Sequence, residues 1–180
     1  MIYVFMANGF EEVEALATVD FLRRCELDVT SVGIGSRQVT GSHAITVVCD
    51  IMDSELSLNH PIETIVLPGG MPGTINLEKS PVVQRLIDYC IDNQILICAI
   101  CAAPSILGHK NILQGVKATC FPGFENELFG ANLSNDYVCH DSNIITAKGV
   151  GYVFDFAQVI ASQFVPPEKA AEIRRSLQCR

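Results

Sequence analysis

The sequence predicts an α/β fold in which a mostly parallel sheet carries helices on both faces. Short apolar runs, typical of buried strands, alternate along the chain with segments of helical periodicity. Hydrophobic residues make up 49% and charged residues 18% of the 180 residues, a composition typical of a compact globular protein. The sequence shows no internal repeat, low-complexity tract or linker, so we expect one domain over residues 1–180.

The individual elements follow from local patterns. Apolar runs predict strands at residues 2–6, 28–33, 64–67, 95–99 and 144–147. Helical patterns predict helices at residues 11–24, 81–93, 103–107, 152–164 and 167–176. Within residues 38–48, the turn Thr40-Gly41-Ser42 separates two short β-prone segments, which predicts a small hairpin.

Three segments that follow predicted strands are expected at one edge of the sheet. They are residues 8–11, the glycine-rich residues 68–73, and Cys101. Parallel strands joined by right-handed crossovers end at the same edge, where ligands of such sheets bind. A carboxylate, a glycine-rich loop and a cysteine therefore meet in one candidate site. Asn76 and Glu78, further along the glycine-rich loop, are interpreted as turn and cap residues.

Cys101 is the candidate nucleophile of this site. Pro104 follows it closely and predicts a helix N-terminus, because the N–H that proline lacks would have no partner there. The unpaired N–H groups of such a terminus favour the thiolate, which is the nucleophilic form. The amides of Gly70 and Ala102 would form an oxyanion hole beside the thiol. For Gly69 and Gly70, a plain strand-to-loop turn is the alternative.

Glu14 is the expected partner of the thiol. Helical spacing places Glu14 on one face with Ala17 and Phe21, while Glu11 and Glu12 point elsewhere. Burial among apolar groups raises the pKa of a carboxyl, and a protonated Glu14 would donate a hydrogen bond to the thiolate and then shuttle a proton. The alternative is that Glu14 caps free N–H groups in the first helical turn.

The histidines do not supply a partner for Cys101. A continuous helix would place His109 roughly 12 Å from Cys101. His43 and His60 lie in turn-like segments, and His140 lies in a polar stretch where we expect it to be exposed. A papain-like Cys-His pair is therefore not supported, which argues against a peptidase.

The eight cysteines are interpreted mainly as reduced, structural thiols, because most lie among apolar neighbours. These are Cys25, Cys49, Cys90, Cys98 and Cys120. Cys98 and Cys101 form C-x-x-C, but an extended strand separates their Cα atoms by roughly 10 Å, beyond the reach of a disulfide. No second C-x-x-C or histidine pair completes a zinc site, and we expect neither a metal nor a cofactor.

Charge and hydropathy exclude several classes of partner. The net charge of −8 argues against binding to a nucleic-acid backbone. No apolar run approaches the roughly 18 residues that span a bilayer, and the N-terminus lacks the basic start of a signal peptide. We expect a cytoplasmic protein with no membrane partner.

Four motifs in order carry a family resemblance. They are Gly9-Phe10-Glu11-Glu12-Val13-Glu14, Val66-Leu67-Pro68-Gly69-Gly70, Ala99-Ile100-Cys101-Ala102-Ala103-Pro104 and Phe154-Asp155-Phe156-Ala157. Over nearly the whole chain the sequence resembles the ThiJ/PfpI superfamily, in the branch of the parkinsonism-associated protein deglycase. The resemblance implies a flavodoxin-like fold of the class I glutamine amidotransferase type and a homodimer. It also implies Cys101 as an oxidisable nucleophile, Glu14 as its hydrogen-bond partner, and Gly70 and Ala102 as anion-binding amides.

The activity implied by the resemblance is a cofactor-independent glyoxalase. The thiolate would attack methylglyoxal or glyoxal, a proton would shift through the glutamate, and lactate or glycolate would be released. Reversal of early glycation adducts on proteins and nucleotides is a second implied activity. The alternative function is a non-enzymatic oxidative-stress sensor or chaperone that uses the same cysteine.

The chain departs from the family pattern near the expected site. Phe121-Pro122 stands where several relatives have His-Pro, and Lys148-Gly149-Val150-Gly151 replaces Arg-Gly-Pro-Gly in a loop near the pocket and the dimer contact. His43 stands where an arginine often reaches across the dimer. Together with Gly69, the residues Phe121, Pro122, Val150 and His43 are candidates for lining the pocket or the dimer contact.

Overall fold

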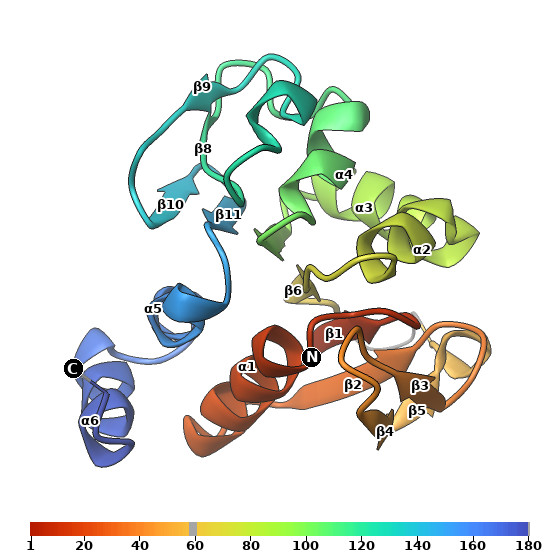
Figure 1. Cartoon of the computed structure of the whole chain (residues 1–180). Coiled ribbons are helices and arrows are strands. Elements are labelled where there is room, and N and C mark those ends of the chain that lie inside the picture. The colour runs from red at the N-terminus through yellow and green to blue at the C-terminus, as the bar shows by residue number, and fades with distance from the viewer. Residues whose placement is uncertain (58–60, 180) are drawn as a thin grey trace.

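The computed structural model describes residues 1–57 and 61–179, built around a seven-stranded sheet in the order β10-β11-β7-β6-β1-β2-β5 (Figure 1). Neighbouring strands pair in parallel except β10, which runs antiparallel to β11. The strands of this sheet are β1 (Ile2–Met6), β2 (Val29–Gly33), β5 (Ile51–Met52), β6 (Thr64–Leu67), β7 (Leu96–Ile100), β10 (Val138–Asp141) and β11 (Ile144–Ala147). The predicted position of His60 lies outside the described residues.

Helices cover both faces of the sheet, as Figure 1 shows. One face carries α1 (Glu12–Arg24), α5 (Val153–Ala161) and α6 (Pro167–Ser176), and the other carries α2 (Gly73–Lys79), α3 (Pro81–Asp92) and α4 (Pro104–His109). Successive residues of β1 alternate between the two cores: Val4 packs on the first face and Phe5 on the second, because strand side chains point to opposite faces in turn. The arrangement is the predicted flavodoxin-like α/β sandwich.

Short elements complete the chain. The predicted hairpin is present as β3 (Gln38–Thr40) antiparallel to β4 (Thr46–Val48). The 3₁₀ turns are η1 (Asp53–Glu55), η2 (Glu125–Glu127) and η3 (Val150–Tyr152), and a further parallel pair joins β8 (Lys117–Ala118) to β9 (Asn132–Leu133). Among the described residues, no helix combines the length and the apolar character needed to cross a bilayer.

Some predicted elements differ from the structure. Asn76 and Glu78, interpreted as turn and cap residues, belong to α2. The predicted helix at residues 152–164 is shorter, since η3 precedes α5 and the helix ends at Ala161. β10 was not predicted; it turns back from β11 at Ser142, which adopts a left-handed conformation with φ of 54°.

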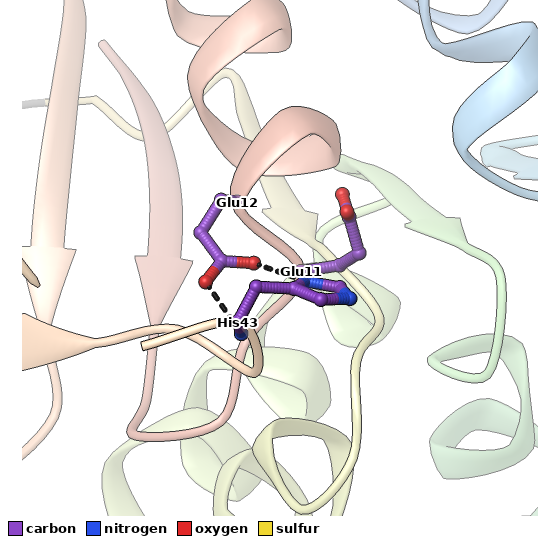
Figure 2. A group of neighbouring side chains, drawn as sticks. All are labelled: Glu11, Glu12 and His43. Atoms are coloured by element: carbon purple, nitrogen blue, oxygen red, sulfur yellow. Dashed lines mark hydrogen bonds and ion pairs between the residues drawn. The ribbon is translucent and has the colours of Figure 1, made fainter. Parts of the chain in front are cut away.

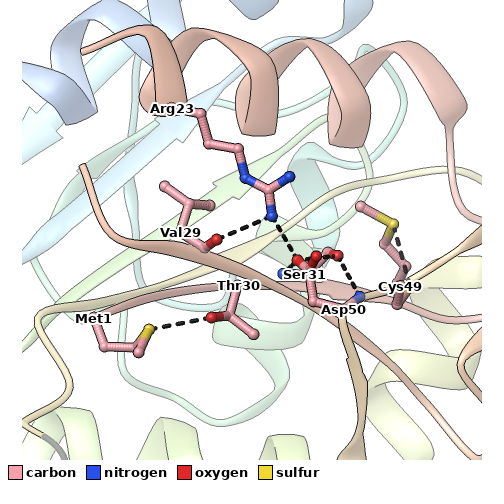
Figure 3. Close-up of polar contacts among 8 residues, drawn as sticks. Met1, Arg23, Val29, Thr30, Ser31, Cys49 and Asp50 are labelled. Carbon is pink, nitrogen blue, oxygen red and sulfur yellow. Dashed lines mark hydrogen bonds and ion pairs between the residues drawn. The ribbon is translucent and has the colours of Figure 1, made fainter. Parts of the chain in front are cut away.

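A polar network ties the segment before β5 to the sheet (Figure 3). One carboxylate oxygen of Asp50 accepts hydrogen bonds from the Ser31 N–H and hydroxyl, both at 2.7 Å, and from Arg23 Nη2 at 2.5 Å. The Ser31 hydroxyl accepts in turn from the Asp50 N–H at 2.9 Å. Asp50 therefore links this segment to β2 and to the C-terminal turn of α1, away from the candidate site.

Candidate active site

The three predicted segments meet at the edge where the parallel strands end. The Glu11 N–H donates to the Gly69 carbonyl at 2.9 Å, and the Gly73 N–H donates to the Gly9 carbonyl at 3.0 Å. A Cβ on Gly69 would lie 2.6 Å from the Cβ of Cys101, closer than real side chains approach. Only glycine at position 69 lets the loop approach the cysteine this closely.

Cys101 occupies a strained turn between β7 and α4. Its φ of 66° lies in the left-handed region, which is unfavourable for residues other than glycine and is found preferentially at functional sites. The Cys101 N–H donates to the Ala147 carbonyl at 2.9 Å, and the Cys101 carbonyl accepts from the Phe121 N–H at 2.8 Å. Hydrogen bonds on both sides thus hold the turn. Pro104 stands in the first turn of α4, as predicted, although the helix itself begins three residues after the cysteine.

Glu14 is buried on α1, with 1% of its surface exposed, as predicted. Its Oε2 accepts a hydrogen bond from the Gly69 N–H at 2.9 Å. The capping role weighed for Glu14 belongs to Glu11, whose Oε2 accepts from the Glu14 N–H at 2.6 Å. The Oε1 of Glu14 is buried and makes no hydrogen bond of normal length. A buried polar atom without a partner carries a free-energy penalty, so this oxygen is poised to bind or exchange a proton.

Three side-chain atoms from distant parts of the chain surround a single point beside Gly149. A Cβ built on Gly149 would lie 3.8 Å from Cys101 Sγ, 3.8 Å from Glu14 Oε1 and 3.3 Å from Phe121 Cδ2. Gly149 therefore stands within side-chain distance of all three groups. A thiol, a carboxyl oxygen and an aromatic edge from distant parts of the chain thus lie together around Gly149.

Burial controls the protonation of both reactive groups. Burial raises the pKa of Glu14 to about 7 against the opposing hydrogen bond from Gly69, and it raises the pKa of Cys101 to about 12 together with the neighbouring Glu14 charge. The amides of Ala102 and Gly70 act on the thiol and lower its pKa, in the predicted direction. The expected preference for thiolate is nevertheless wrong, because the loss of hydration outweighs these two amides.

The pair is therefore a thiol beside a carboxyl whose pKa burial raises towards neutral pH. The two groups interact, so their protons belong to the pair rather than to either residue alone. A carboxylate with a pKa near 7 is suited to take a proton from a thiol as the sulfur attacks. This order differs from the prediction, in which a protonated Glu14 would donate to a thiolate, because an ionised Glu14 would first accept the proton of the thiol.

The remaining predicted residues are spread around the site. Val150 lies in η3, is 45% exposed and lowers the pKa of Glu14 through its N–H. Pro122 lines a separate cavity of about 250 Å³ together with Cys120 and Lys148. Of the departures from the family pattern, Val150 acts on Glu14 through its backbone, and Phe121 is the one whose ring lies beside Gly149.

His43 and Glu12 form a hairpin anchor beside the site (Figure 2). Glu12 Oε1 accepts from the His43 N–H at 2.7 Å, and Glu12 Oε2 lies 2.9 Å from His43 Nδ1. Burial raises the pKa of Glu12, but these hydrogen bonds outweigh burial and lower the pKa to about 2. Helical periodicity predicted that Glu12 lies off the helix face that carries Glu14. It did not predict that Glu12 would be only 4% exposed, because the hairpin that covers Glu12 is distant in sequence.

Within the part of the chain that the structure describes, the same cluster brings together three side chains that could hold a metal ion. Atoms of Glu11, Glu12 and His43 lie within 4.8 Å of one another. Each carboxylate already accepts a hydrogen bond, from the Glu14 N–H and from His43 respectively. We therefore assign this cluster to holding the hairpin rather than to a metal.

The described histidines pair away from Cys101. His109 lies between two carboxylates, with Nδ1 2.5 Å from Glu78 Oε1 and Nε2 2.8 Å from Glu127 Oε2. His140 is exposed, as predicted, and its Nε2 lies 3.1 Å from the Ser142 carbonyl. All eight cysteines are free, and among them only Cys101 and Cys179 are partly exposed.

Comparison with known proteins finds relatives along nearly the whole chain. The model of the DJ-1/PfpI family matches residues 1–163. Parkinson disease protein 7 homolog of Danio rerio is 32% identical over 180 residues, which cover 97% of this chain and 94% of the relative. The glutathione-independent glyoxalase DJR-1.2 of Caenorhabditis elegans is 30% identical over 169 residues, covering 93% of this chain and 89% of the relative.

Solved structures show the same fold. A DJ-1 superfamily protein of Salmonella typhimurium superposes with a TM-score of 0.94 at 31% identity, covering 99% of this chain and 98% of that one. Drosophila melanogaster DJ-1beta superposes with a TM-score of 0.93 at 29% identity, covering 99% and 97%. On the extent of the match and the identity with these relatives, the chain belongs to the DJ-1/PfpI family.

Proposed function

We propose that this protein is a cofactor-independent enzyme of the glyoxalase or deglycase type, which uses Cys101 as nucleophile and Glu14 as proton shuttle. The observation that carries the proposal is the proximity of Glu14 and Cys101: Oε1 and Sγ lie around Gly149, and each group shifts the pKa of the other. A raised pKa of about 7 lets this carboxyl accept and return protons at neutral pH. The glyoxalase named among the relatives of the chain supports the choice of reaction class.

The reaction on methylglyoxal begins with attack of the Cys101 sulfur on the aldehyde carbon. The C–S bond forms as Glu14 accepts the thiol proton, and the carbonyl oxygen becomes a hydroxyl or an oxyanion near the Gly70 and Ala102 amides. Once it has returned its first proton to that oxygen, Glu14 moves a proton from the former aldehyde carbon to the neighbouring carbon, and the hydroxyl proton passes to the ketone oxygen, which gives the thioester of lactate. Water cleaves this C–S bond, so that lactate leaves and the thiol is restored. Early glycation adducts would enter the same sequence through their carbonyl carbon.

The test is consumption of methylglyoxal in the absence of glutathione. Wild type is compared with Cys101→Ser and Glu14→Gln, and the product is identified as lactate. We expect turnover by wild type and a loss of at least 100-fold in either variant, the range in which a positioned acid or base contributes. Equal consumption by all three proteins would reject the proposal.

An oxidative-stress sensor is the second candidate, favoured by the contrast between Cys101 and the other thiols. Cys101 is partly exposed and within reach of two amides, whereas six of the other cysteines are buried. One similar structure, with 28% identity, is that of Toxoplasma gondii DJ-1 in an oxidized form. A sensor would gain two oxygens, about 32 Da, at Cys101 under mild peroxide, and peptide mass spectrometry would locate them. Oxidation spread over many thiols would contradict a sensor.

A further inference from the structure

We propose that Tyr137 and Tyr152 form an oxidative modification site, at which a one-electron oxidant joins the two rings in an intramolecular dityrosine cross-link. The two rings are stacked, with centroids 4.0 Å apart and planes that differ by 11°. Neither Cys101 nor the proposed enzymatic reaction takes part in the cross-linking, so the inference stands apart from the proposed function.

The stack differs from the other aromatic contacts of the described residues. Three other ring pairs have centroids 5.4–6.5 Å apart and planes tilted by 46–51°, an arrangement that the quadrupole of aromatic rings favours. Nearly parallel rings at 4.0 Å lie closer than this preference. The surrounding chain must therefore bring the two tyrosines together.

The backbone fixes both tyrosines against one short loop, residues 148–151. Tyr137 directly precedes β10, and its carbonyl accepts a hydrogen bond from the Lys148 N–H at 3.0 Å. Tyr152 ends η3, and its N–H donates to the Gly149 carbonyl at 2.9 Å. Lys148 Nζ also lies over the Tyr137 ring, 5.4 Å from its centroid, which is a favourable cation–π contact.

The hydroxyl groups of the two rings are neighbours. Hydrogen bonding with Tyr137 raises the pKa of Tyr152, with smaller contributions from burial and from the charge of Tyr137. Nearly parallel rings with neighbouring hydroxyl groups place the carbons ortho to those groups opposite each other. These carbons carry unpaired electron density in a phenoxyl radical, and they form the new bond in dityrosine.

The pair is accessible and has room to react. Tyr137 is 56% exposed and Tyr152 is partly exposed, so a small oxidant can reach both rings. Both tyrosines line a cavity of about 1210 Å³ together with side chains of α5, which leaves space for a ring to turn out of the stack. Of the two other tyrosines in the chain, Tyr3 is buried and Tyr89 is 40% exposed on α3.

The reaction consumes two equivalents of a one-electron oxidant, such as a carbonate radical or a ferryl haem. Each tyrosine gives up one electron and its phenolic proton, which leaves two phenoxyl radicals. These radicals couple through their ortho carbons into one C–C bond, and the hydrogen on each of these carbons moves to a phenol oxygen. The protein thus loses two hydrogen atoms. Because the rings are already in contact, coupling within the pair is favoured over coupling between molecules.

The cross-link ties the segment before β10 to η3 and encloses residues 138–151 in a covalent ring. Such a bond constrains the unfolded chain and so stabilises the folded one. The ring includes Gly149, which stands within side-chain distance of Cys101 Sγ and Glu14 Oε1. Oxidation of the tyrosine pair thus fixes the loop that borders the candidate active site.

The experiment oxidises the whole protein with ruthenium(III) tris-bipyridine, generated by light and persulfate. The partly exposed thiols of Cys101 and Cys179 are first blocked with iodoacetamide, so that they do not reduce the radicals. The chain contains no tryptophan, so the blue fluorescence of dityrosine is measured without tryptophan emission. We expect this fluorescence on protein of monomer mass under denaturing conditions, with a yield per chain that does not change on dilution.

Peptide mass spectrometry locates the cross-link. Trypsin cleaves after Lys148, which places the two tyrosines on separate peptides, and these peptides should be found joined. Tyr137→Phe and Tyr152→Phe keep both rings but remove one phenol, and each should abolish the dityrosine of the monomer. Tyr89→Phe is the matched control, which removes an exposed tyrosine and should leave the yield unchanged.

Several results would overturn the inference. They are the absence of dityrosine from wild type, fluorescence that is confined to covalent dimers and falls on dilution, and an equal yield in Tyr137→Phe or Tyr152→Phe. Cross-linked wild type should also unfold at a higher urea concentration than Tyr152→Phe treated in the same way. An equal midpoint, corrected for the difference before oxidation, would contradict the tie between β10 and η3.

Discussion

Replacing Glu14 by Gln should stabilise the protein, and the gain should grow with pH. Glu14 is 1% exposed, and burial raises its pKa to about 7. The folded state therefore holds the proton more tightly than the unfolded state does. The contribution of Glu14 to the free energy of unfolding is fully present below its unfolded pKa of about 4.5, and it is lost as pH rises through the folded pKa of about 7. Glutamine keeps the shape and an oxygen for the Gly69 N–H but never becomes charged.

The magnitude follows from the two pKa values. One pKa unit corresponds to about 1.4 kcal/mol, so the interval from 4.5 to about 7 amounts to about 3 kcal/mol by pH 8.5. At pH 5 the same relation leaves less than about 1 kcal/mol. Glu14→Gln should thus unfold with a free energy about 3 kcal/mol above wild type at pH 8.5 and close to wild type at pH 5.

Urea unfolding at several pH values measures this difference. The matched control is Glu172→Gln, which removes an exposed carboxylate of α6 and should leave the free energy of unfolding within about 0.5 kcal/mol of wild type at every pH. A Glu14→Gln difference that stays constant with pH, or a variant less stable than wild type at pH 8.5, would refute the reasoning.

Three further predictions follow from other contacts. Gly149→Ala places a methyl group 3.3 Å from Phe121 Cδ2 and 3.8 Å from Cys101 Sγ, at a φ of 157° that L side chains rarely adopt, and kcat/KM should fall at least tenfold while the far-UV spectrum is unchanged; full activity would contradict the role of Gly149 beside the reactive pair. Glu12→Ala leaves the His43 N–H without its acceptor and should lower the free energy of unfolding by about 1–3 kcal/mol. Because the pKa of Glu12 is lowered to about 2, this difference in the free energy of unfolding should close as pH falls from 4.5 towards 2. Urea unfolding at several pH values measures it, and a difference that does not change with pH would contradict the prediction. The carboxylates of Glu127 and Glu78 raise the pKa of His109, so stability from His109 is present below 6.5 and lost as pH rises through the raised pKa. Hydrogen exchange in η2 should therefore be faster in His109→Gln than in wild type at pH 6, and equal rates would contradict this.

The sequence predicted most of the sheet because its strands are buried on both faces. Residues 2–6, 64–67 and 144–147 have the bounds that the structure shows, since apolar runs bounded by turn residues are a strong local signal. Helix α2 was missed because it has only seven residues and begins at Gly73. A Cβ there would lie 2.5 Å from the Phe10 nitrogen, so the glycine is required by a contact that is distant in sequence.

The sequence predicted which residues meet in the candidate site, but it did not predict their protonation states. Strand ends and helical spacing brought Cys101, Gly70 and Glu14 together, because parallel topology determines which loops are neighbours. The pKa of Cys101 was predicted in the wrong direction because local sequence shows a nearby helix end but not the burial of the thiol. Phe121 reaches the site through a backbone contact between positions 101 and 121, for which the residues themselves gave no local signal.

The most direct test of the account is the pH dependence of Cys101 alkylation by iodoacetamide in wild type and in Glu14→Gln. If Glu14 is the base that activates the thiol, the wild-type rate should rise with an inflection near pH 7, where Glu14 ionises. In Glu14→Gln the base is absent and burial still raises the pKa of the thiol, so the inflection should move above pH 9. An inflection at the same pH in both proteins would contradict the pairing of Glu14 with Cys101.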